Sequence, residues 1–587
     1  MKKRKFTITI KQKIKKEKIM EPITPTTSTT KRITNRKRKI VIRIPKDAKP
    51  KPKTLTIRVS KAFKRKMDEG GLCVGKQCKQ ESIFQQVKTH MKMAGYPLMP
   101  HQVDGVKWMM EREKNSPNNP IKGGLLCDDP GLGKTIQTCA CMLGNPKKRT
   151  LLIVPCSVIG QWKKILLEVF PDHQLKVHRG QKRPKNYHGI VRGYRNSSFV
   201  ITTLGTLTKD VSYFLISGYW NRIVFDEIHD IRNGGANYRA AILLNSEIKW
   251  GLSGTPIQNR LGDLSNIYRF LDVNDGKGIG MNSVRELNER YMKKRTKEEV
   301  AEKDPNLVLG EKKEMEYEMD FGTPEERAIY DKIRKNVKSE FESMVNSAHS
   351  NSAKMACFFE LLLRLRQASL HPQLALNGFS RKYGRNMGTY GSRSTKFTKL
   401  VNLIREKRDS NCIVFCNFRE EMDMIGEELG KCGIGYRKYT GSMNDKQRKE
   451  CLGSFVNYKV ACNTDMMMRL PIELCGLIQS YAPRVLLIQI KAGSVGLNLQ
   501  QFTEVFYPLG DWNPSNEIQA TSRAHRLNQT ETVTVHKLRL RVPDPAYETI
   551  DDRIFAIQQK KLKMVERCMT GKGGNQLSIG DFRSLLS

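Results

Sequence analysis

The sequence predicts an α/β protein with two separate blocks of parallel sheet, each covered by helices on both faces. With 587 residues the chain is too long for one hydrophobic core, so at least two folded blocks are expected. Short, continuously apolar runs recur in both blocks, as they do in strands buried within parallel sheets. Segments with apolar residues at helical spacing lie between these runs, and such alternation is typical of a parallel sheet between helix layers.

The first block spans residues 67–275. Its clearest predicted strands are the apolar runs at 151–154 and 223–225, and apolar residues from Val158 to Phe170 then follow the spacing of one helix face. The second block spans residues 391–560 and contains the apolar runs 413–415, 485–488 and 505–507. Residues 276–390 are charged and mostly helical in period, which predicts a helical protrusion between the blocks, and residues 561–587 are assigned to a C-terminal tail.

The formal net charge of +44 predicts a polyanionic partner, and nucleic acid is the usual one. An acidic membrane surface is the alternative polyanion. No stretch approaches the roughly 18 apolar residues that a membrane-spanning helix needs, so no membrane span is expected. The 14 cysteines are scattered rather than grouped in sets of about four, so the sequence predicts no zinc site. Reduced thiols in a cytosolic or nuclear compartment are expected instead.

Half of the charge surplus lies in the first 66 residues, where 25 Lys and Arg face only 3 Asp and Glu. Such a segment cannot bury enough apolar surface to offset the entropy of ordering, so we expect a disordered basic tail. The run NRKRK at 35–39 is typical of a nuclear localisation signal or of a non-specific DNA tether. A tail that only improves solubility is the alternative.

A glycine-rich turn, GLLCDDPGLGKT at 124–135, joins a predicted strand to a predicted helix. Backbone N–H groups in such a turn and at the helix N-terminus are suited to phosphate. Lys134 would reach the β and γ phosphates of a nucleotide, and the Thr135 hydroxyl would bind Mg²⁺. Asp128 stands where the strict pattern has its first glycine, so an ordinary turn is the alternative.

Two acidic residues, Asp226 and Glu227, end the predicted strand at 223–225. Asp226 can hold Mg²⁺ through water, and Glu227 can polarise the water that attacks the γ phosphate. Phosphoryl transfer depends on this kind of positioning and charge cancellation more than on covalent chemistry. The two motifs together therefore predict a site for nucleotide hydrolysis.

In the second block Gln519, Arg523 and Arg526 stand at positions i, i+4 and i+7, which predicts one shared helix face. From a second lobe, that face could place guanidinium groups on a γ phosphate held by the first lobe. An arginine finger supplied in this way makes hydrolysis depend on closure of the two lobes. Arginines that only face solvent are the alternative.

Taken in order, these motifs resemble those of the Swi/Snf family of superfamily 2 DNA translocases. Pro100, His101 and Gln102 resemble the family's adenine-reading motif. Similar to its further motifs are residues 123–135 (I), 151–162 (Ia), 199–207 (Ib), 253–259 (III), 413–418 (IV), 491–499 (V) and 519–530 (VI). The stretch LRLRQASLHP at 363–372 leans toward the family's DNA-repair branch, although the RING finger usual in that branch is absent.

The resemblance implies two RecA-like lobes that use ATP and Mg²⁺, with Arg526 as the arginine finger and Arg523 as its partner. It implies that ATP is held by Gln102, Asp128, Asp129, Pro130, Gly131, Leu132, Gly133, Lys134, Thr135 and Gln519. Phosphates of the nucleic acid are expected at Ser157, Gln161, Thr202, Thr203, Lys491 and Asn498. Trp162 lies in the same motif as Ser157, but its spacing favours core packing over contact with nucleic acid.

Residues 457–484 form an insertion where the family needs only a short connection. The stretch LPIELCGLIQSY at 470–481 is similar to the start of an F-box, which would bind a protein partner. A helical hairpin that decorates the lobe is the alternative.

The expected function is ATP-driven translocation on double-stranded DNA, with remodelling of nucleosomes or other DNA-bound proteins in repair or transcription. The expected location is the nucleus, or the host nucleus if the source is a large DNA virus, with a cytoplasmic factory or virion as alternatives. An RNA helicase of the same superfamily and a catalytically weak nucleic-acid scaffold with an F-box-like insert are the competing functions.

Overall fold

The computed structural model of the chain describes residues 76–114, 121–181, 183–184, 194, 196–216, 220–257, 261–273, 281–345, 352–455, 483–490 and 497–570. Predictions for the tail at 1–66, for the segment 571–587, for Lys491 and for all but the last two residues of the insertion 457–484 lie outside these residues. Within them no helix is both long enough and apolar enough to cross a membrane.

The first block folds around a sheet in which every recorded strand pairing is parallel. The strand order is β3-β4-β2-β5-β6-β1-β7, so the nucleotide-loop strand β1 lies near one edge. Its strands are β1 Lys122–Leu126, β2 Thr150–Ile153, β3 Leu175–His178, β4 Phe199–Thr202, β5 Trp220–Asp226, β6 Ser246–Leu252 and β7 Met292–Lys293. The apolar runs at 151–154 and 223–225 are thus confirmed as neighbouring strands, β2 and β5.

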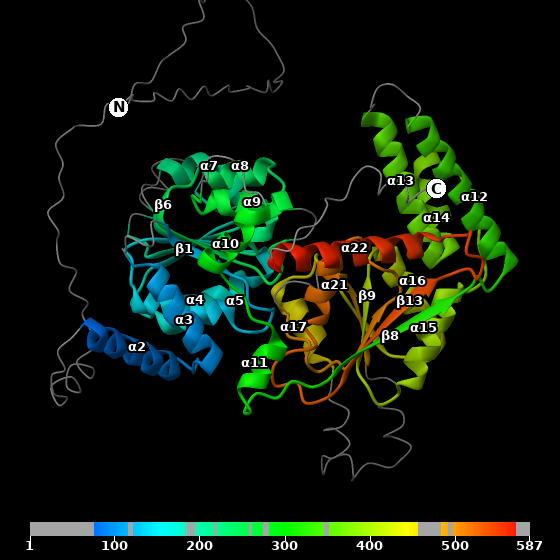
Figure 1. Ribbon diagram of the computed structural model, residues 1–587. Coiled ribbons are helices and arrows are strands. Elements are labelled where there is room, and N and C mark those ends of the chain that lie inside the picture. The colour runs from blue at the N-terminus through cyan, green and yellow to red at the C-terminus, as the bar shows by residue number, and fades with distance from the viewer. Residues whose placement is uncertain are drawn as a thin grey trace, which may run out of the picture. The chain divides into compact units, whose positions relative to one another are not determined.

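Helices cover both faces of this sheet (Figure 1). One layer contains α2 Lys76–Met93, α3 Pro100–Arg112, α4 Lys134–Gly144 and α5 Ile159–Val169, and the other contains α7 Leu204–Ile216, α8 Ala236–Ile242 and α9 Leu261–Phe270. Successive strand residues point to opposite faces, so Leu152 and Val224 enter one apolar cluster whereas Leu151 and Ile223 enter the other. Burial on both faces is why these strands are apolar throughout.

The second block has the same architecture, as the α/β prediction requires. Its sheet has the order β10-β11-β9-β12-β13-β8, again with parallel pairings. The strands are β8 Lys312–Met319, β9 Cys412–Cys416, β10 Tyr436–Tyr439, β11 Val485–Gln489, β12 Glu504–Tyr507 and β13 Val533–Leu540. Helices α15 Thr395–Glu406 and α16 Arg419–Lys431 contribute to one apolar cluster, and α17 Asp445–Gly453 and α21 Pro514–Thr521 to the other. Both RecA-like lobes are therefore present.

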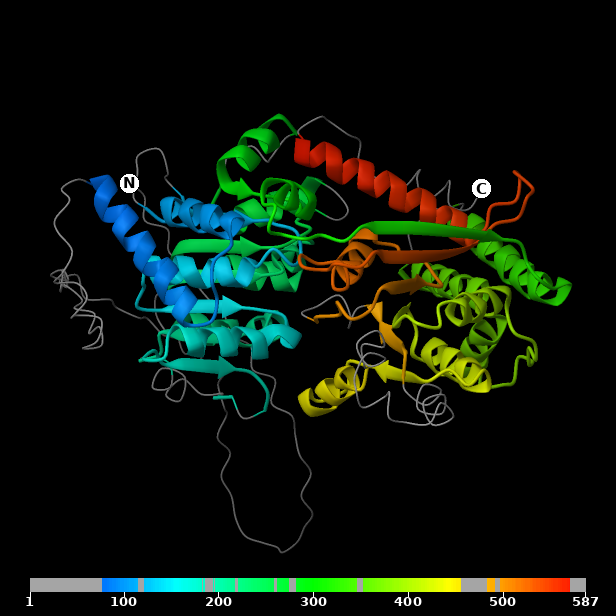
Figure 2. The ribbon, with the colours of Figure 1, turned by 90° about the horizontal axis from the view of Figure 1, so that it is seen from below.

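Residues 276–390 differ from the helical prediction at two strands. Helices α10 Met281–Tyr291, α11 Lys297–Lys303, α12 Pro324–Val345, α13 Ser352–Leu370 and α14 Pro372–Tyr383 account for most of the segment. However, β7 joins the first sheet beside β1, and β8 joins the second sheet beside β13, as Figure 2 shows for the green and orange strands. Strand β8 has the sequence KKEMEYEM and lacks the apolar run of a central strand. It lies at the edge of the sheet, where charged side chains can be exposed to solvent.

Candidate nucleotide and nucleic-acid site

The glycine-rich turn lies between the end of β1 and the start of α4. Gly133 has φ of +80°, and a Cβ atom placed there would lie 2.3 Å from Nε2 of Gln102, so only glycine fits. Lys134 Nζ donates to the carbonyl oxygen of Asp128 at 2.7 Å, and the turn therefore folds around the ammonium group. The N-terminus of α4, with its unpaired N–H groups, opens toward this turn, as phosphate binding requires.

The adenine-motif helix α3 is attached to the same turn. Gln102 Nε2 donates to the carbonyl oxygen of Leu132 at 3.3 Å, and a ring nitrogen of His101 lies 3.1 Å from that oxygen. Gln102 Oε1 accepts from the backbone N–H of Met99 at 3.1 Å, which fixes the orientation of the amide. The structure thus brings Gln102 against the loop that carries the other predicted ATP contacts.

Asp128, predicted to bind the nucleotide, turns its carboxylate into the protein. The side chain is fully buried, and Arg295 Nε donates to its Oδ1 at 2.9 Å while a second guanidinium nitrogen pairs with Oδ2. Gln137 Nε2 also donates to Oδ2 at 2.9 Å. Asp128 can therefore contact a nucleotide only through its backbone, and its side chain instead anchors the loop.

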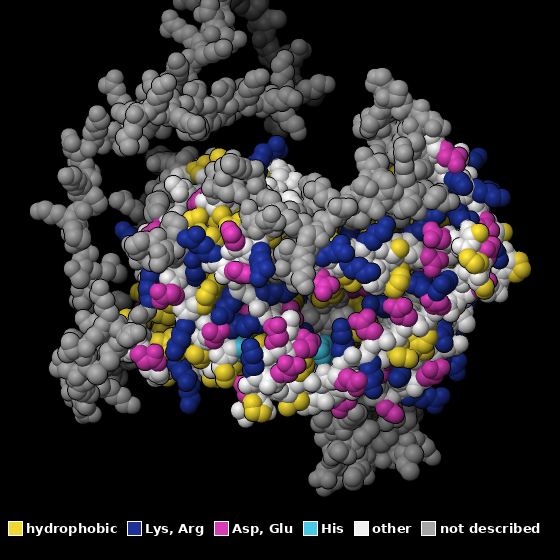
Figure 3. All heavy atoms as spheres, in the orientation of Figure 1, with side chains coloured by type: hydrophobic (Ala, Val, Ile, Leu, Met, Phe, Trp, Pro, Cys, Tyr) yellow, Lys and Arg dark blue, Asp and Glu magenta, His cyan; other side chains and the backbone are white. Residues whose placement is uncertain are grey.

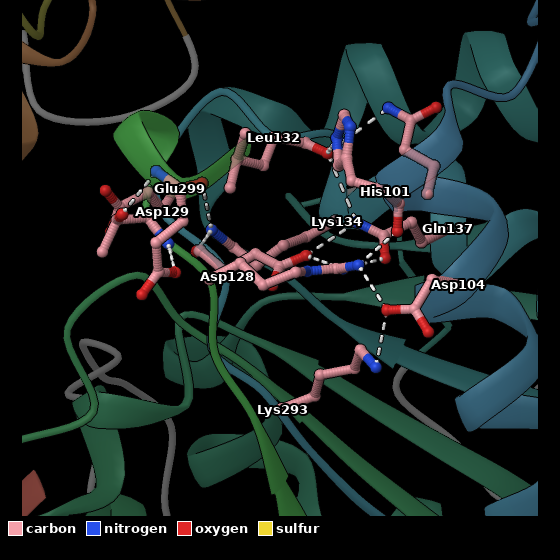
Figure 4. A network of polar contacts seen from close by, with 12 residues as sticks. His101, Asp104, Asp128, Asp129, Leu132, Lys134, Gln137, Lys293 and Glu299 are labelled. Atoms are coloured by element: carbon pink, nitrogen blue, oxygen red, sulfur yellow. Dashed lines mark hydrogen bonds and ion pairs between the residues drawn. The ribbon is translucent and has the colours of Figure 1, made fainter. Parts of the chain in front are cut away.

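Arg295 is the residue of this site that sequence reasoning missed. Besides Asp128 it binds Oε1 of Gln137 at 2.9 Å, Oδ2 of Asp104 at 3.1 Å and the carbonyl oxygen of His101. Figure 4 shows His101, Asp104, Asp128 and Gln137 gathered in this network. A buried acid needs a cation, but the sequence does not indicate which of 103 Lys and Arg side chains supplies it.

The acidic pair lies at the carboxyl end of β5, level with the end of β1. Both Asp226 and Leu126 pair in register with Leu252 of β6, so the loop and the acid lie on either side of one strand. Trp162 Nε1 donates to Asp226 Oδ2 at 2.9 Å. Burial raises the pKa of Asp226, and the adjacent charge of Glu227 raises it further. Ligands that carry positive charge, such as Mg²⁺, would favour its ionised form.

Glu227 has a left-handed backbone, with φ of 56°, which is uncommon outside glycine and is found at functional sites. Burial acts to raise its pKa, but contact with His229 and the charges of Lys134 and Arg523 together hold that pKa below its ordinary range. Glu227 is therefore ionised at neutral pH. A carboxylate in this state can accept a hydrogen bond from water.

Oxygen donors in this region fit Mg²⁺, which prefers carboxylate, hydroxyl and water ligands. Asp226 supplies a carboxylate whose Oδ2 is already oriented by Trp162. Thr135 follows Lys134 in the first turn of α4 and supplies a hydroxyl. These are the two residues that the sequence predicts for the metal.

The second-lobe motif at 519–530 contacts the first lobe, but its residues do not lie on one helix face as predicted. Helix α21 ends at Thr521, so Arg523 and Arg526 lie in the turn that follows and not at helical positions. The prediction of one helix face is therefore wrong for the two arginines. Tighter backbone hydrogen bonds that span three residues, Arg523 N to Ala520 O at 3.1 Å and Ala524 N to Thr521 O at 3.0 Å, form the turn that follows the helix.

The three side chains nevertheless converge on the nucleotide site. Gln519 Nε2 donates to Thr255 Oγ1 of the first lobe at 2.8 Å. Arg523 is buried, which lowers its pKa, and its charge interacts with Glu227 and Asp226. Burial likewise lowers the pKa of Arg526 to about 10, and Arg526 Cγ lies 3.6 Å from where a Cβ atom on Gly131 would stand. Both arginines remain cationic at neutral pH.

The predicted contacts to nucleic acid divide into exposed and buried side chains. Ser157, Gln161 and Asn498 are exposed, and Thr203 is half-buried with its hydroxyl 2.9 Å from Oγ1 of Thr206. Thr202 is fully buried, and its hydroxyl donates to the carbonyl oxygen of His178 at 3.0 Å. Because it ends strand β4 facing inward, its side chain does not reach the surface, and we remove it from the expected contacts.

Charge on the described surface is mixed rather than gathered. On the face seen in Figure 3, Lys and Arg side chains are interspersed with Asp and Glu side chains. A uniformly basic patch does not mark the nucleic-acid track on this face.

Comparison with known families supports both lobes. Residues 101–277 match the SNF2-related domain, and residues 395–469 match the helicase conserved C-terminal domain. The first match includes the glycine-rich turn and the acidic pair. The second includes β9 and the following helices of the second lobe.

Curated relatives include bacterial and viral proteins. The chain is 30% identical over 472 residues to YwqA of Bacillus subtilis, which is named as an ATP-dependent helicase/translocase. The alignment covers 75% of this chain and 46% of that protein. It is 25% identical over 516 residues to a global transactivator of Orgyia pseudotsugata multicapsid polyhedrosis virus, covering 83% of this chain and 94% of that protein. The chain thus spans about half the bacterial relative and almost all of the viral one.

Among solved structures, the Sulfolobus solfataricus SWI2/SNF2 ATPase core in complex with dsDNA aligns with a TM-score of 0.34 and 24% identity. The alignment covers 83% of this chain and 96% of that chain.

Proposed function

From the premise that this chain belongs to the SNF2-type ATPases of helicase superfamily 2, we propose that it hydrolyses ATP to move along double-stranded DNA. The observation that carries the proposal is the meeting of both lobes at one site. Lys134 and Glu227 come from the first lobe, whereas Arg523 and Arg526 come from the second. Such a site is complete only while the lobes are together, so each hydrolysis event is tied to relative motion of the lobes.

In the proposed reaction Lys134 leaves the carbonyl oxygens of the turn and binds the β and γ phosphates. Mg²⁺, when bound, neutralises phosphate charge, and Thr135 and Asp226 would hold it. Glu227 accepts a hydrogen bond from the attacking water and orients it toward the γ phosphorus. Arg526, with Arg523 beside it, balances the negative charge that develops on the γ phosphate.

Exposed residues on both lobes are proposed to follow the phosphates of the duplex. Ser157, Gln161 and Thr203 lie on the first lobe and Asn498 on the second, and their hydroxyl and amide groups can form hydrogen bonds to phosphate oxygens. Contacts of this kind fix position without reading sequence, so weak sequence preference is expected. The net charge of +44 predicts in addition a steep salt dependence, because Lys and Arg that neutralise phosphates release counterions. Nucleosomes and other DNA-bound complexes in the nucleus are the proposed targets.

An RNA helicase is the competing function, and motif III bears on it. That class would carry alanine where this chain has Gly254. A Cβ atom at Gly254 would lie 2.8 Å from Cδ of Pro130 in the nucleotide turn. The turn and motif III therefore fit together here only with glycine, which favours the DNA translocase.

The test is ATP turnover by the purified chain with double-stranded DNA, single-stranded DNA, RNA and nucleosomes. We expect stimulation by duplex DNA, and its loss in both Lys134→Ala and Glu227→Gln. Glu289→Gln is the matched control, because Glu289 is an exposed residue of α10 that forms an ion pair with exposed Arg285. Undiminished turnover in Lys134→Ala, or stimulation by RNA alone, would overturn the proposal.

A further inference from the structure

Trp162 links a surface helix of the first lobe to the acidic pair. Its indole ring is fully buried in the apolar cluster beneath α5, and its Nε1–H donates to Asp226 Oδ2 at 2.9 Å. The residue thus satisfies the core-packing prediction but also has a polar contact that packing does not require. A hydrogen bond from a neutral donor to a buried carboxylate is among the stronger kinds in proteins.

The same helical region presents the proposed DNA contacts. Gln161 precedes Trp162 in α5 and is exposed, and Ser157 is exposed in the short 3₁₀ segment before α5. Neighbouring residues of a helix point about 100° apart, so one helix turn carries an outward amide and an inward indole. The segment 157–162 therefore exposes Ser157 and Gln161, which are proposed to contact the duplex. Its last residue, Trp162, is buried and binds Asp226, the proposed metal ligand.

We propose that Trp162 is a positioning residue that holds the Asp226 carboxylate in the orientation for Mg²⁺ and transmits DNA binding at α5 to that carboxylate. With Oδ2 held by the indole N–H, the rotation of the carboxylate is restricted and Oδ1 is directed away from Trp162. Duplex phosphates bound at Ser157 and Gln161 would restrain α5, and a restrained α5 restrains the indole. The DNA-linked part of this inference rests on the proposed function.

The chain contains a matched control for this hydrogen bond. Trp250 is also fully buried in the same apolar cluster, and its Nε1–H donates to Glu113 Oε1 at 2.8 Å. Glu113 forms a buried ion pair with Arg222 and takes no part in the nucleotide site. Trp250→Phe therefore removes the same indole and the same kind of bond as Trp162→Phe, but at a carboxylate without a proposed metal role.

The experiment measures the Mg²⁺ concentration at which binding of a fluorescent ADP analogue is half-complete, with and without duplex DNA. We expect Trp162→Phe to raise this midpoint about tenfold, equivalent to about 1.4 kcal/mol, and to abolish the lowering of the midpoint by DNA. Trp250→Phe should keep both wild-type values, although it should lose thermal stability to a similar extent. If Trp162→Phe does not fold, Trp162→Met replaces it, since its flexible apolar side chain fills part of the space and carries no N–H or O–H donor for Asp226.

A wild-type midpoint in Trp162→Phe, or an equal shift in Trp250→Phe, would overturn the inference. A midpoint that DNA does not change in the wild type would overturn its DNA-linked part. These outcomes are separate from those of the proposed function, because analogue binding needs no hydrolysis. If the chain fails to hydrolyse ATP but Trp162→Phe shows the tenfold shift, the role of Trp162 at the metal site stands and the proposed translocase activity is wrong.

Discussion

Arg295 and Asp128 form an ion pair at the nucleotide turn, and the Asp128 carboxylate is fully buried while the Arg295 side chain is only 13% exposed. The backbone reinforces the contact, because Asp129 N donates to the Arg295 carbonyl oxygen at 3.0 Å. The segment after β7 is thus joined to the turn through both side chain and backbone. The positive charge of Arg295 therefore has a structural role in the site, because it holds the turn in place.

Removing the Arg295 charge should be strongly destabilising. Arg295→Met leaves Asp128 buried without its cation, and loss of one partner of a buried pair costs about 3–5 kcal/mol. Denaturant unfolding should show this loss. Arg285→Met is the control, because Arg285 and Glu289 form an ion pair with side chains 69% and 66% exposed, and its loss should stay below about 1 kcal/mol. Equal effects of the two variants would contradict the structural role of Arg295.

Glycine at position 133 should be essential for nucleotide binding. Gly133→Ala combines a φ of +80° with a Cβ atom 2.3 Å from Gln102 Nε2, so the turn and the adenine motif must both shift. We expect the affinity for an ATP analogue to fall by about tenfold or more, equal to at least about 1.4 kcal/mol. Gly430→Ala in α16 meets nothing within 4 Å and should leave affinity unchanged. Wild-type affinity in Gly133→Ala would contradict the geometry of the turn.

Some of these features could be predicted from the sequence, and others depend on tertiary contacts. β2 and β5 were predictable because burial on both faces requires unbroken apolar runs, as at Leu151 and Val224. β8 was not, because an edge strand can be charged. Motif spacing identified Arg523 and Arg526, but the backbone hydrogen bonds of the turn after Thr521 end the helix that the spacing implied. The partner of Asp128 follows only from the folded chain.

Acid should weaken the fold through His371, which lies at the N-terminus of α14. Burial lowers its pKa from 6.5 to about 4, against the smaller opposing effect of Glu428, and its Nδ1 accepts from Gln373 N at 3.2 Å. Between pH 4 and 6.5 the unfolded chain binds a proton that the folded chain excludes, so stability rises with pH across this window and is lost as pH falls. The loss is at most about 3 kcal/mol.

The matched variant is His371→Asn, whose side-chain oxygen can accept the same N–H but does not titrate. Urea unfolding at pH 7, 5.5 and 4 should show a smaller fall in stability for His371→Asn than for the wild type. The variant His371→Asn also loses the ring contact with Phe397, which lowers its free energy of unfolding by the same amount at each pH. Parallel losses in the two proteins would exclude His371 as the source.

The central claim is ATP-driven movement along an intact duplex, and displacement of a third strand from a DNA triplex measures it directly. The same preparation is tested on a forked duplex, with Glu227→Gln as the inactive control. The account predicts that ATP releases the third strand, that the fork stays paired and that Glu227→Gln releases nothing. Efficient opening of the fork, or ATP turnover on duplex DNA without release of the third strand, would contradict it.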